Sequence, residues 1–351
     1  MVSKEPNVSI VGAGIAGLAA AIALAGQGRK IVLYERAAKF EEVGAGLQLG
    51  PNAVRALQTI GAWDAVEPIT YAPPAIRMHN GGSGRLLKEI DLSLFERRYG
   101  QPYRVAHRAD LHAALVAVAA ANRNIEILLG QEVDAATLDG EVIAADGVRS
   151  ATRVKLFPGS EALTTNDAIY RALVPMLPRI DANVNLWMFP GGHVVHYPVA
   201  NKLNLVAVTQ GASPSVHFAK AHFSLKSVLD LAGDWTSWPG AYVPALPSWQ
   251  KNNITLIGDA AHGTLPFLAQ GAAMALEDAA ELVTSKNWAA RQARTQRLHR
   301  ATLEAGKTYH LSGLYALARD GVIAVLPSQS ILNRLDWIYG MTRPGGLPPP
   351  P

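Results

Sequence analysis

The stretch that decides the fold is VSIVGAGIAGLAAAIALAGQGRKIVLYERA, residues 8–37. Two short apolar runs lie on either side of a segment rich in alanine and leucine, which predicts a buried strand, a helix and a second strand. The turn before the helix carries Gly12, Gly14 and Gly17 in the spacing G-x-G-x-x-G. This spacing alone is weak evidence. Together with the two runs it predicts the first unit of a doubly wound α/β sheet that binds a dinucleotide.

The glycines, and the acid that ends the second run, each have a physical reason. Gly12 permits a tight turn, Gly14 lets the backbone approach a pyrophosphate, and Gly17 lets the helix pack on the strand. The helix N-terminus offers free N–H groups and the positive end of its dipole to that pyrophosphate. Glu35 follows about 20 residues later, where a carboxylate accepts hydrogen bonds from ribose hydroxyls. We therefore expect an adenine dinucleotide to bind at Gly12, Gly14, Ala16, Gly17, Glu35 and Arg36.

Further polar residues stand where other predicted elements begin or end. Gln48 lies in a glycine-rich loop before a helix, Arg108 precedes another helix, and Asp146 ends an apolar strand in EVIAADGVRSATR. The stretch ITLIGDAAHGTLPFLAQGAAMALEDAA, residues 254–280, ends an apolar run at Asp259 and then opens a helix of small residues. Each feature alone could be an ordinary cap or turn. Their recurrence in one α/β chain indicates a lined crevice.

Composition excludes several classes of protein. The 351 residues include no cysteine, which removes disulfides, thiolate metal sites and dithiol redox chemistry. The net charge is +4 and the basic residues form no long run, so we expect no nucleic acid as partner. No run of about 20 apolar residues and no signal-peptide pattern is present. We expect a cytoplasmic monomer or homodimer, without stable membrane insertion and without a metal.

Three motifs in this order, GAGIAG, ADGVRS and GDAAHGTLPFLAQGAAMALEDA, carry a resemblance to a known family. The chain resembles the single-component flavin-dependent aromatic hydroxylases of the 4-hydroxybenzoate and salicylate hydroxylase type, from Val8 to about Gly340. A glutathione-reductase-like enzyme would need a second nucleotide-binding unit and a cysteine pair, and the sequence has neither.

The resemblance implies an α/β fold: a Rossmann-like, GR2-type FAD-binding domain with an inserted antiparallel β-sheet substrate domain and C-terminal helices. On this basis, we expect the FAD-binding domain to be discontinuous. Its expected parts are 1–72, 101–165 and 250–285. The substrate domain takes 73–100 and 166–249, and the C-terminal helical region with its proline-rich tail takes 286–351.

The resemblance also implies roles for single residues. Asp259 would hydrogen-bond the ribityl and pyrophosphate region of FAD, and Arg108 the phosphates or ribityl chain. Asp146 would border the groove where FAD and NADH or NADPH meet, and Pro266 would lie by the flavin ring at the reaction face. Gln48 would border flavin and substrate. The helix that opens with Gly271, Ala272 and Ala273 would point its dipole at the flavin pyrimidine ring and stabilise negative charge there.

Between the second and third motifs, four segments predict a substrate-binding sheet. The segments 168–175, 183–190, 192–200 and 202–210 are rich in β-branched and aromatic residues. His193 and Tyr197 are four residues apart and share a strand face, whereas His196 lies on the other. A lone strand histidine is more often a core or solvated residue. In the family branch that acts on salicylate, 3-hydroxybenzoate and hydroxynicotinate, however, the resemblance puts this pair on the substrate hydroxyl. A base with a near-neutral pKa would help to ionise a phenol there.

The function implied is an FAD-dependent monooxygenase that consumes NADH or NADPH. It would hydroxylate a phenolic or N-heteroaromatic acid with O2 through a flavin C4a-hydroperoxide. Two alternatives stay open: a tailoring hydroxylase or epoxidase of a larger secondary metabolite, and a catalytically silent FAD-binding protein. The second alternative follows from segments that are short for the family, namely 132–143, 211–235 and 285–296.

Overall fold

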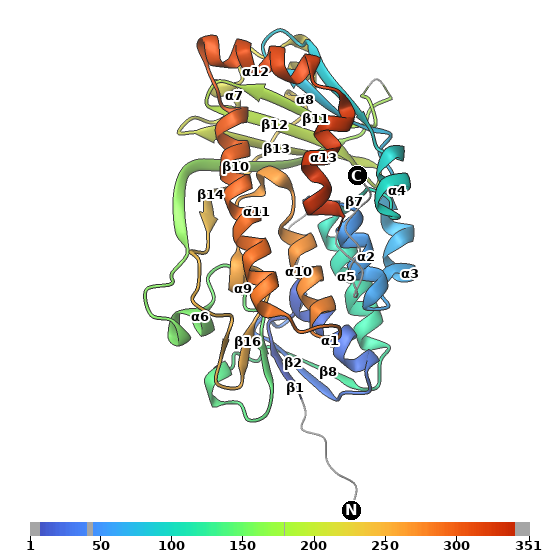
Figure 1. The fold of residues 1–351 in the computed structure, drawn as a ribbon, viewed down its shortest axis with the longest axis vertical. Coiled ribbons are helices and arrows are strands. Elements are labelled where there is room, and N and C mark those ends of the chain that lie inside the picture. The colour runs from blue at the N-terminus through green and yellow to red at the C-terminus, as the bar shows by residue number, and fades with distance from the viewer. Residues whose placement is uncertain (1–7, 41–44, 179, 341–351) are drawn as a thin grey trace, which may run out of the picture.

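The computed structural model describes residues 8–40, 45–178 and 180–340 (Figure 1). A six-stranded sheet forms one end of the molecule, in the order β15-β16-β9-β1-β2-β8. All its neighbouring strands are parallel except β15 and β16. The strands are β1 (Val8–Val11), β2 (Ile31–Glu35), β8 (Ile125–Leu129), β9 (Val142–Ala144), β15 (Gln250–Lys251) and β16 (Ile254–Leu256).

Helices rich in small apolar residues pack on this sheet. Nearly every residue of α1 from Ile15 to Ala25 is buried, because α1 lies between the sheet, α5 and α10. The same core takes side chains from α2 and α3. The helices and short 3-10 turns of this end are α1 (Ile15–Gly26), α2 (Pro51–Thr59), α3 (Trp63–Val66), η1 (Glu67–Ile69), α5 (Arg108–Ala120), η2 (Ala135–Thr137), α6 (Ala151–Leu156), α9 (Asp259–His262), η3 (Pro266–Leu268) and α10 (Gly271–Glu281).

A seven-stranded sheet forms the other end, in the order β14-β10-β13-β12-β11-β5-β6. It is antiparallel except for the pair β5 and β11, which is parallel. Its strands are β5 (Ala75–Asn80), β6 (Leu86–Asp91), β10 (Leu163–Pro175), β11 (Val184–Phe189), β12 (Gly192–Val199), β13 (Lys202–Gln210) and β14 (Thr236–Tyr242). A small sheet of β3 (Gly46–Leu49), β7 (Arg104–His107) and β4 (Thr70–Tyr71) lies between the two ends.

The remaining helices cover the seven-stranded sheet and link the two ends. The long helix α11 runs along the side of the molecule, and α12 and α13 follow it over the second sheet (Figure 1). These helices are α4 (Ser93–Tyr99), α7 (Pro214–His217), α8 (Phe223–Leu229), α11 (Trp288–Tyr309), α12 (Gly313–Val325) and α13 (Ser328–Tyr339).

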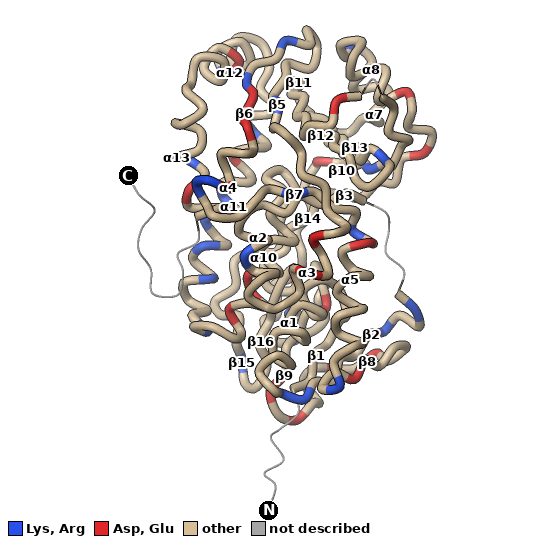
Figure 2. Tube along the Cα trace, turned by 90° about the vertical axis from the view of Figure 1, so that its right-hand side faces the viewer, with Lys and Arg blue, Asp and Glu red and all other residues tan. Residues whose placement is uncertain are grey.

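The α/β fold class expected from the sequence is confirmed, and the four predicted substrate strands are β10 to β13. β10 begins five residues earlier than expected, at Leu163, and the sheet gains β5, β6 and β14. The exact domain boundaries stay a prediction. In Figure 2, basic and acidic residues are interspersed over the trace. No helix in the described ranges is both long enough and apolar enough to span a bilayer.

Candidate active site

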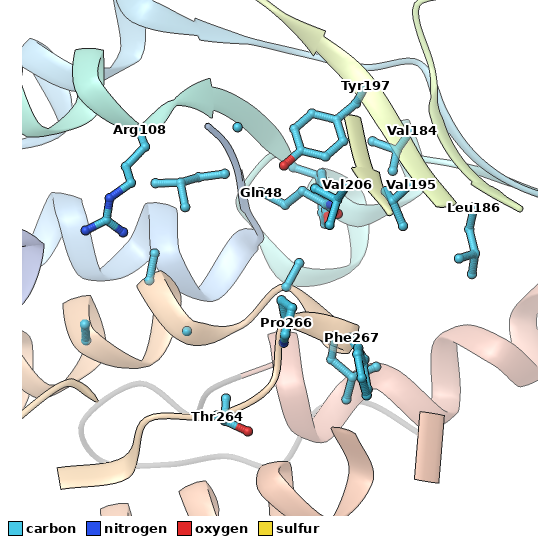
Figure 3. Close-up of a pocket in the computed structure, with 18 of the residues that line it drawn as sticks. Gln48, Arg108, Val184, Leu186, Val195, Tyr197, Val206, Thr264, Pro266 and Phe267 are labelled. Carbon is cyan, nitrogen blue, oxygen red and sulfur yellow. The ribbon is translucent and has the colours of Figure 1, made fainter. Parts of the chain in front are cut away.

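A cavity of about 370 Å³ lies where the two large sheets meet. One end of it is formed by the first glycine turn, Arg108 and the start of α10. The other end is formed by strands of the seven-stranded sheet (Figure 3). Ten of the residues expected from the sequence line it: Gly14, Ala16, Gln48, Arg108, His193, Tyr197, Asp259, Pro266, Gly271 and Ala272. Residues separated by up to 258 positions in the chain are thus brought to one cavity.

The first glycine turn has two glycines required by packing and one that faces open space. Gly12 has a φ of 99°, and a Cβ built on it would lie 2.5 Å from the carbonyl oxygen of Ala145. A Cβ on Gly17 would overlap the carbonyl oxygen of Gly12. A Cβ on Gly14 would meet no protein atom within 4 Å. Gly14 therefore leaves room on the cavity side, which is what a pyrophosphate at a helix N-terminus requires.

Glu35 holds the first glycine turn through its carboxylate. Its carboxylate accepts hydrogen bonds from the backbone N–H of Ala13 at 2.8 Å and of Ala37 at 2.9 Å. Because an ionised carboxylate has about four lone-pair positions, both oxygens keep capacity for a ribose hydroxyl. Glu35 is not itself part of the cavity lining.

His112 supports the same turn and was not anticipated from the sequence. Its Nε2 donates a hydrogen bond to the carbonyl oxygen of Ala13 at 2.8 Å, and the ring is 4% exposed. His112 follows Arg108 by one helical turn on α5, so both side chains lie on the face toward the cavity. The signal in the sequence was a histidine four residues after a predicted ligand, at the start of the apolar part of the helix.

The start of α10 faces the cavity with Gly271 and Ala272, and Ala273 is fully buried behind them. A Cβ on Gly271 would meet no protein atom within 4 Å. This opening is compatible with a planar ring lying against the helix N-terminus, and that role of α10 stays a prediction.

A buried ionic network fixes α10. Asp278 accepts from the backbone N–H of Gly258 at 2.8 Å, bonds His262 at 2.5 Å and pairs with Arg291 at 2.7 Å. Glu277 pairs with Arg291 and with Arg294. Burial alone would raise the pKa of Glu277, but the two guanidinium groups outweigh it and lower that pKa to about 2. His262 is thus a partner of Asp278, in agreement with a structural role.

The opposite end of the cavity is lined by aromatic side chains. Tyr197 is 3% exposed, and burial raises its pKa above the usual value, although the positive charge of Arg171 acts in the other direction. Gln48 lies beside Tyr197 (Figure 3) and accepts a hydrogen bond from the hydroxyl of Tyr103 at 2.5 Å. Tyr309 and Tyr339 complete the tyrosines of this end. Pro266 and Phe267 lie across the cavity from Tyr197 and Gln48 (Figure 3).

His193 is buried to 2% exposure and bonds another histidine. Its Nδ1 lies 2.8 Å from Nε2 of His310, at the end of α11. Burial, and to a smaller extent the charge of His310, lowers the pKa of His193 to about 3. The expected near-neutral pKa was therefore wrong, because strand alternation gives no measure of how completely a side chain is desolvated. His196 is also buried, against Trp187, and does not line the cavity.

Comparison with known proteins agrees with this geometry. The family described as FAD binding domain matches residues 5–155 and 226–308. The chain is 30% identical to a 3-hydroxybenzoate 6-hydroxylase of Polaromonas naphthalenivorans (strain CJ2), with 95% of each chain covered. It is 30% identical to a 6-hydroxynicotinate 3-monooxygenase of Bordetella bronchiseptica (strain ATCC BAA-588 / NCTC 13252 / RB50), covering 79% of this chain and 82% of that one. The chain belongs to the single-component FAD-dependent aromatic hydroxylases.

The fold of this hydroxylase also matches solved structures. It is similar to that of Klebsiella pneumoniae HpxO complexed with FAD and uric acid, with a TM-score of 0.83 and 20% identity over 97% of this chain and 98% of that one. FAD is the cofactor of the family, and the open space at Gly14 and Gly271 fits it. The described residues contain no cluster of side chains suited to a metal ion.

Two residues expected at the cofactor of this hydroxylase have other surroundings. Asp146 accepts hydrogen bonds from Ser150 Oγ at 2.5 Å and from the backbone N–H of Thr152 at 3.1 Å. Its carboxylate thus caps the turn into α6, the ordinary role for an acid before a helix, and only its neighbours Ala145 and Gly147 line the cavity. Arg36 is exposed beyond the end of β2 and does not line the cavity.

Arg171 on β10 is a residue of the hydroxylase site that sequence reasoning missed. It lines the first cavity and also a second one of about 720 Å³, and both cavities share Asp259, Thr264 and Pro266. Its Nε is buried without a hydrogen-bond partner, and its guanidinium lies 5.6 Å from the centre of the Trp238 ring. The signal was a charged residue inside the largely apolar run 168–175 of β10.

Proposed function

We propose that this chain is an NAD(P)H-dependent monooxygenase that hydroxylates a small phenolic or N-heteroaromatic acid. The observation that carries the proposal is one continuous cavity with two chemically different ends. One end offers open backbone at two glycine turns, and the other offers buried tyrosines and branched aliphatic side chains. A dinucleotide fits the first kind of surface and a flat aromatic ring the second.

The size of the cavity favours a small substrate. Its volume of about 370 Å³ lies near the lower end of the range for ligand pockets. A single substituted ring suits a cavity of this size better than a larger secondary metabolite. The relatives named above are called a 3-hydroxybenzoate 6-hydroxylase and a 6-hydroxynicotinate 3-monooxygenase, which supports the same class of substrate.

Bound FAD would supply the electron transfer from NADH or NADPH and the activation of O2. The protein's own residues would orient the ring, exclude water and control a proton. Tyr197 and His193 share a face of β12 and would contact the substrate hydroxyl. The tyrosine hydroxyl would donate to a phenolate oxygen, because its raised pKa keeps it protonated. Gln48, held by Tyr103, would fix that hydroxyl in place.

Charge in the cavity suits an anionic ligand. Arg171 and Arg108 both line it, and Asp259 lies at the boundary with the second cavity. The positive charge of Arg171 acts on the Tyr197 hydroxyl and lowers its pKa against the effect of burial. We assign Arg171 to the negative charge of the aromatic acid. Pro266, with no backbone N–H, would present a flat apolar contact at the reaction face.

The second cavity would admit the reducing nucleotide. It meets the first at Pro266 and Thr264, and it is lined by Arg149, Arg171 and the partly exposed ring of Trp238. Two guanidinium groups and an indole ring suit a phosphate and a nicotinamide. Its larger volume and contact with Asp259 fit a transient co-substrate that approaches the flavin from this side.

The test is a ligand panel followed by turnover. Purified protein is supplemented with FAD, and salicylate, 3-hydroxybenzoate and 6-hydroxynicotinate are titrated while the flavin absorbance is recorded. We expect at least one ligand to shift the spectrum and to stimulate NAD(P)H oxidation and oxygen uptake. Protein that is colourless once unbound FAD has been removed contradicts the proposal. So does NAD(P)H oxidation that no aromatic acid stimulates, which would favour a catalytically silent FAD-binding protein.

A matched pair of variants distinguishes the loss of a tyrosine hydroxyl inside the cavity from the same loss elsewhere in the sheet. Tyr197→Phe removes a hydroxyl inside the cavity. Tyr170→Phe removes one on β10 of the same sheet, separated from β12 by β13, where Tyr170 packs edge-on against Trp235 outside the lining. We expect only Tyr197→Phe to change substrate stimulation.

A further inference from the structure

The buried His193 has one hydrogen-bond partner that leads out of the cavity. Its Nδ1 lies 2.8 Å from Nε2 of His310, and His193 Nε2 has no partner among the described residues. His193 is 2% exposed, whereas His310 at the end of α11 is partly exposed to solvent. The pair therefore has one end at the cavity and one end toward water.

A second chain of hydrogen-bonding side chains starts at the cavity but ends inside the protein. Tyr197 leads to Gln48 and Tyr103, and Tyr103 is 4% exposed within a cluster of aromatic side chains. Burial raises the pKa of Tyr103 well above its usual value, so this hydroxyl keeps its proton. Burial likewise raises the pKa of Tyr309, whose ring packs edge-on against His193, to about 12. These hydroxyls can donate hydrogen bonds, but they cannot release a proton to solvent at neutral pH.

We propose that His193 and His310 form a proton relay that carries the phenolic proton of a bound aromatic acid from the cavity to solvent. The proposal rests on the proposed function above and adds His310, which follows the last residue of α11 and lies far from every motif in the sequence. His193 would touch the substrate. His310 would act through His193, as a positioning residue that also receives the proton.

The transfer balances without leaving a charge on either ring. The O–H bond of the phenol breaks as His193 Nε2 takes the proton, while His193 Nδ1 passes its proton to His310 Nε2. His310 then releases the proton on its Nδ1 to water. The substrate becomes a phenolate, and each histidine has changed tautomer. The reverse sequence returns a proton to the product and restores both tautomers, so the relay is reset in each cycle.

The surroundings of the pair suit this exchange. Burial lowers the pKa of both rings, so both are neutral at pH 7 and each can donate at one nitrogen while it accepts at the other. Phe267 packs edge-on against both rings, which shields the bond between them from water. Around His310, the carboxylate of Asp167 raises its pKa, while His217 and Arg319 lower it. The carbonyl oxygen of His310 accepts from the N–H of Gly191, which ties the end of α11 to the loop before β12.

The experiment measures proton release on binding, without turnover. Anaerobic holoenzyme is mixed with salicylate, 3-hydroxybenzoate or 6-hydroxynicotinate in weak buffer, and a pH indicator and the phenolate absorbance are followed by stopped flow. His310→Ala should slow ionisation of the bound phenol by about 10²-fold, the scale of a lost general base, with little change in Kd. Added imidazole should restore part of the rate. His217→Ala is the matched control, because His217 bonds the carbonyl of Pro190 and not His193, and it should ionise the ligand as the wild type does.

A second variant separates the relay from simple positioning. His310→Gln can still hydrogen-bond His193 but cannot pass a proton on, so we expect it to be as slow as His310→Ala. Ionisation at the wild-type rate in either variant would overturn the relay. The relay would also be wrong if His310→Ala were slow without rescue by imidazole and His310→Gln were fast, because His310 would then only position His193. If no aromatic acid binds the wild type, the proposed function fails and the relay with it. If the wild type hydroxylates a ligand but the variants are unaffected, the relay alone is wrong.

Discussion

The substitutions Gly14→Ala and Gly17→Ala add the same methyl group three residues apart, yet we expect them to damage different properties of the protein. A Cβ on Gly17 overlaps the Gly12 carbonyl oxygen, so α1 must move away from β1. A Cβ on Gly14 meets no protein atom within 4 Å, but it enters the space that a pyrophosphate needs. Gly17→Ala should therefore damage the fold itself, and Gly14→Ala should damage cofactor binding alone.

The magnitudes follow from these contacts. Overpacking costs about 1–3 kcal/mol, and two backbone segments that cannot rotate away put Gly17→Ala near the upper end. For a chain of this length an unfolding entropy of about 2 cal/mol/K per residue converts that loss to a fall in Tm of about 4 °C. At Gly14 the φ of −72° suits alanine, so apo stability should change by less than about 0.5 kcal/mol. Losing one charge-assisted hydrogen bond to the pyrophosphate costs about 1.5–3 kcal/mol, or about 10- to 100-fold in the FAD Kd.

The assay compares thermal unfolding of apo and FAD-loaded protein with FAD titration by flavin fluorescence. Saturating FAD raises Tm according to its affinity, so this rise should shrink in Gly14→Ala. In Gly17→Ala the apo Tm should already be low. A Gly14→Ala variant that binds FAD like the wild type, or a Gly17→Ala variant with an unchanged apo Tm, would refute the reasoning.

Four further outcomes are expected. Tyr197→Phe should lower kcat/KM for the aromatic acid by about 10- to 100-fold in oxygen-uptake assays, because a donor to the developing phenolate is lost. Arg171→Met should raise the Kd of the acid by about 10-fold or more in flavin-absorbance titrations, since a charged hydrogen bond disappears. Glu277→Gln should cost about 3–5 kcal/mol in urea unfolding, because Arg291 keeps a buried charge with fewer partners. The pKa values of Glu277 and Asp278 are lowered to about 2, so the unfolded state takes up protons first on acidification. Stability should be constant above about pH 5 and fall between about pH 4.5 and pH 2, which unfolding curves across that range would check.

The parts of the fold that the sequence predicted are those governed by local pattern. The run from Val8 to Glu35 contains its own strand, turn, helix and second strand, so periodicity and glycine spacing are sufficient to identify it. Enrichment in β-branched and aromatic residues likewise identified the strands β10 to β13. The additional strands β5 and β6 join that sheet through a parallel pairing with β11, a contact between segments about 110 residues apart. No local pattern reports such a pairing.

The residues of the candidate site likewise fall into those that sequence patterns could identify and those that they could not. Gly14, Gln48, Tyr197 and Asp259 belong to motifs or to strand alternation, and the structure brings them to one cavity. Arg171 and His310 could not be found by those means, because their relevance depends on which elements pack together in space. Asp146 shows that membership of a motif does not fix the contacts of a side chain. Its carboxylate accepts hydrogen bonds from Ser150 and Thr152 at the start of the following helix.

The central claim is that this cavity transfers one oxygen atom from O2 to an aromatic acid. The most direct measurement is mass spectrometry of the product formed under ¹⁸O₂ from FAD-loaded protein, NAD(P)H and the tightest-binding acid of the panel. The account predicts a hydroxylated acid that carries a single ¹⁸O atom, with oxygen uptake coupled to its formation. Consumption of O2 that yields only hydrogen peroxide with every acid, or a product labelled from water, would contradict it.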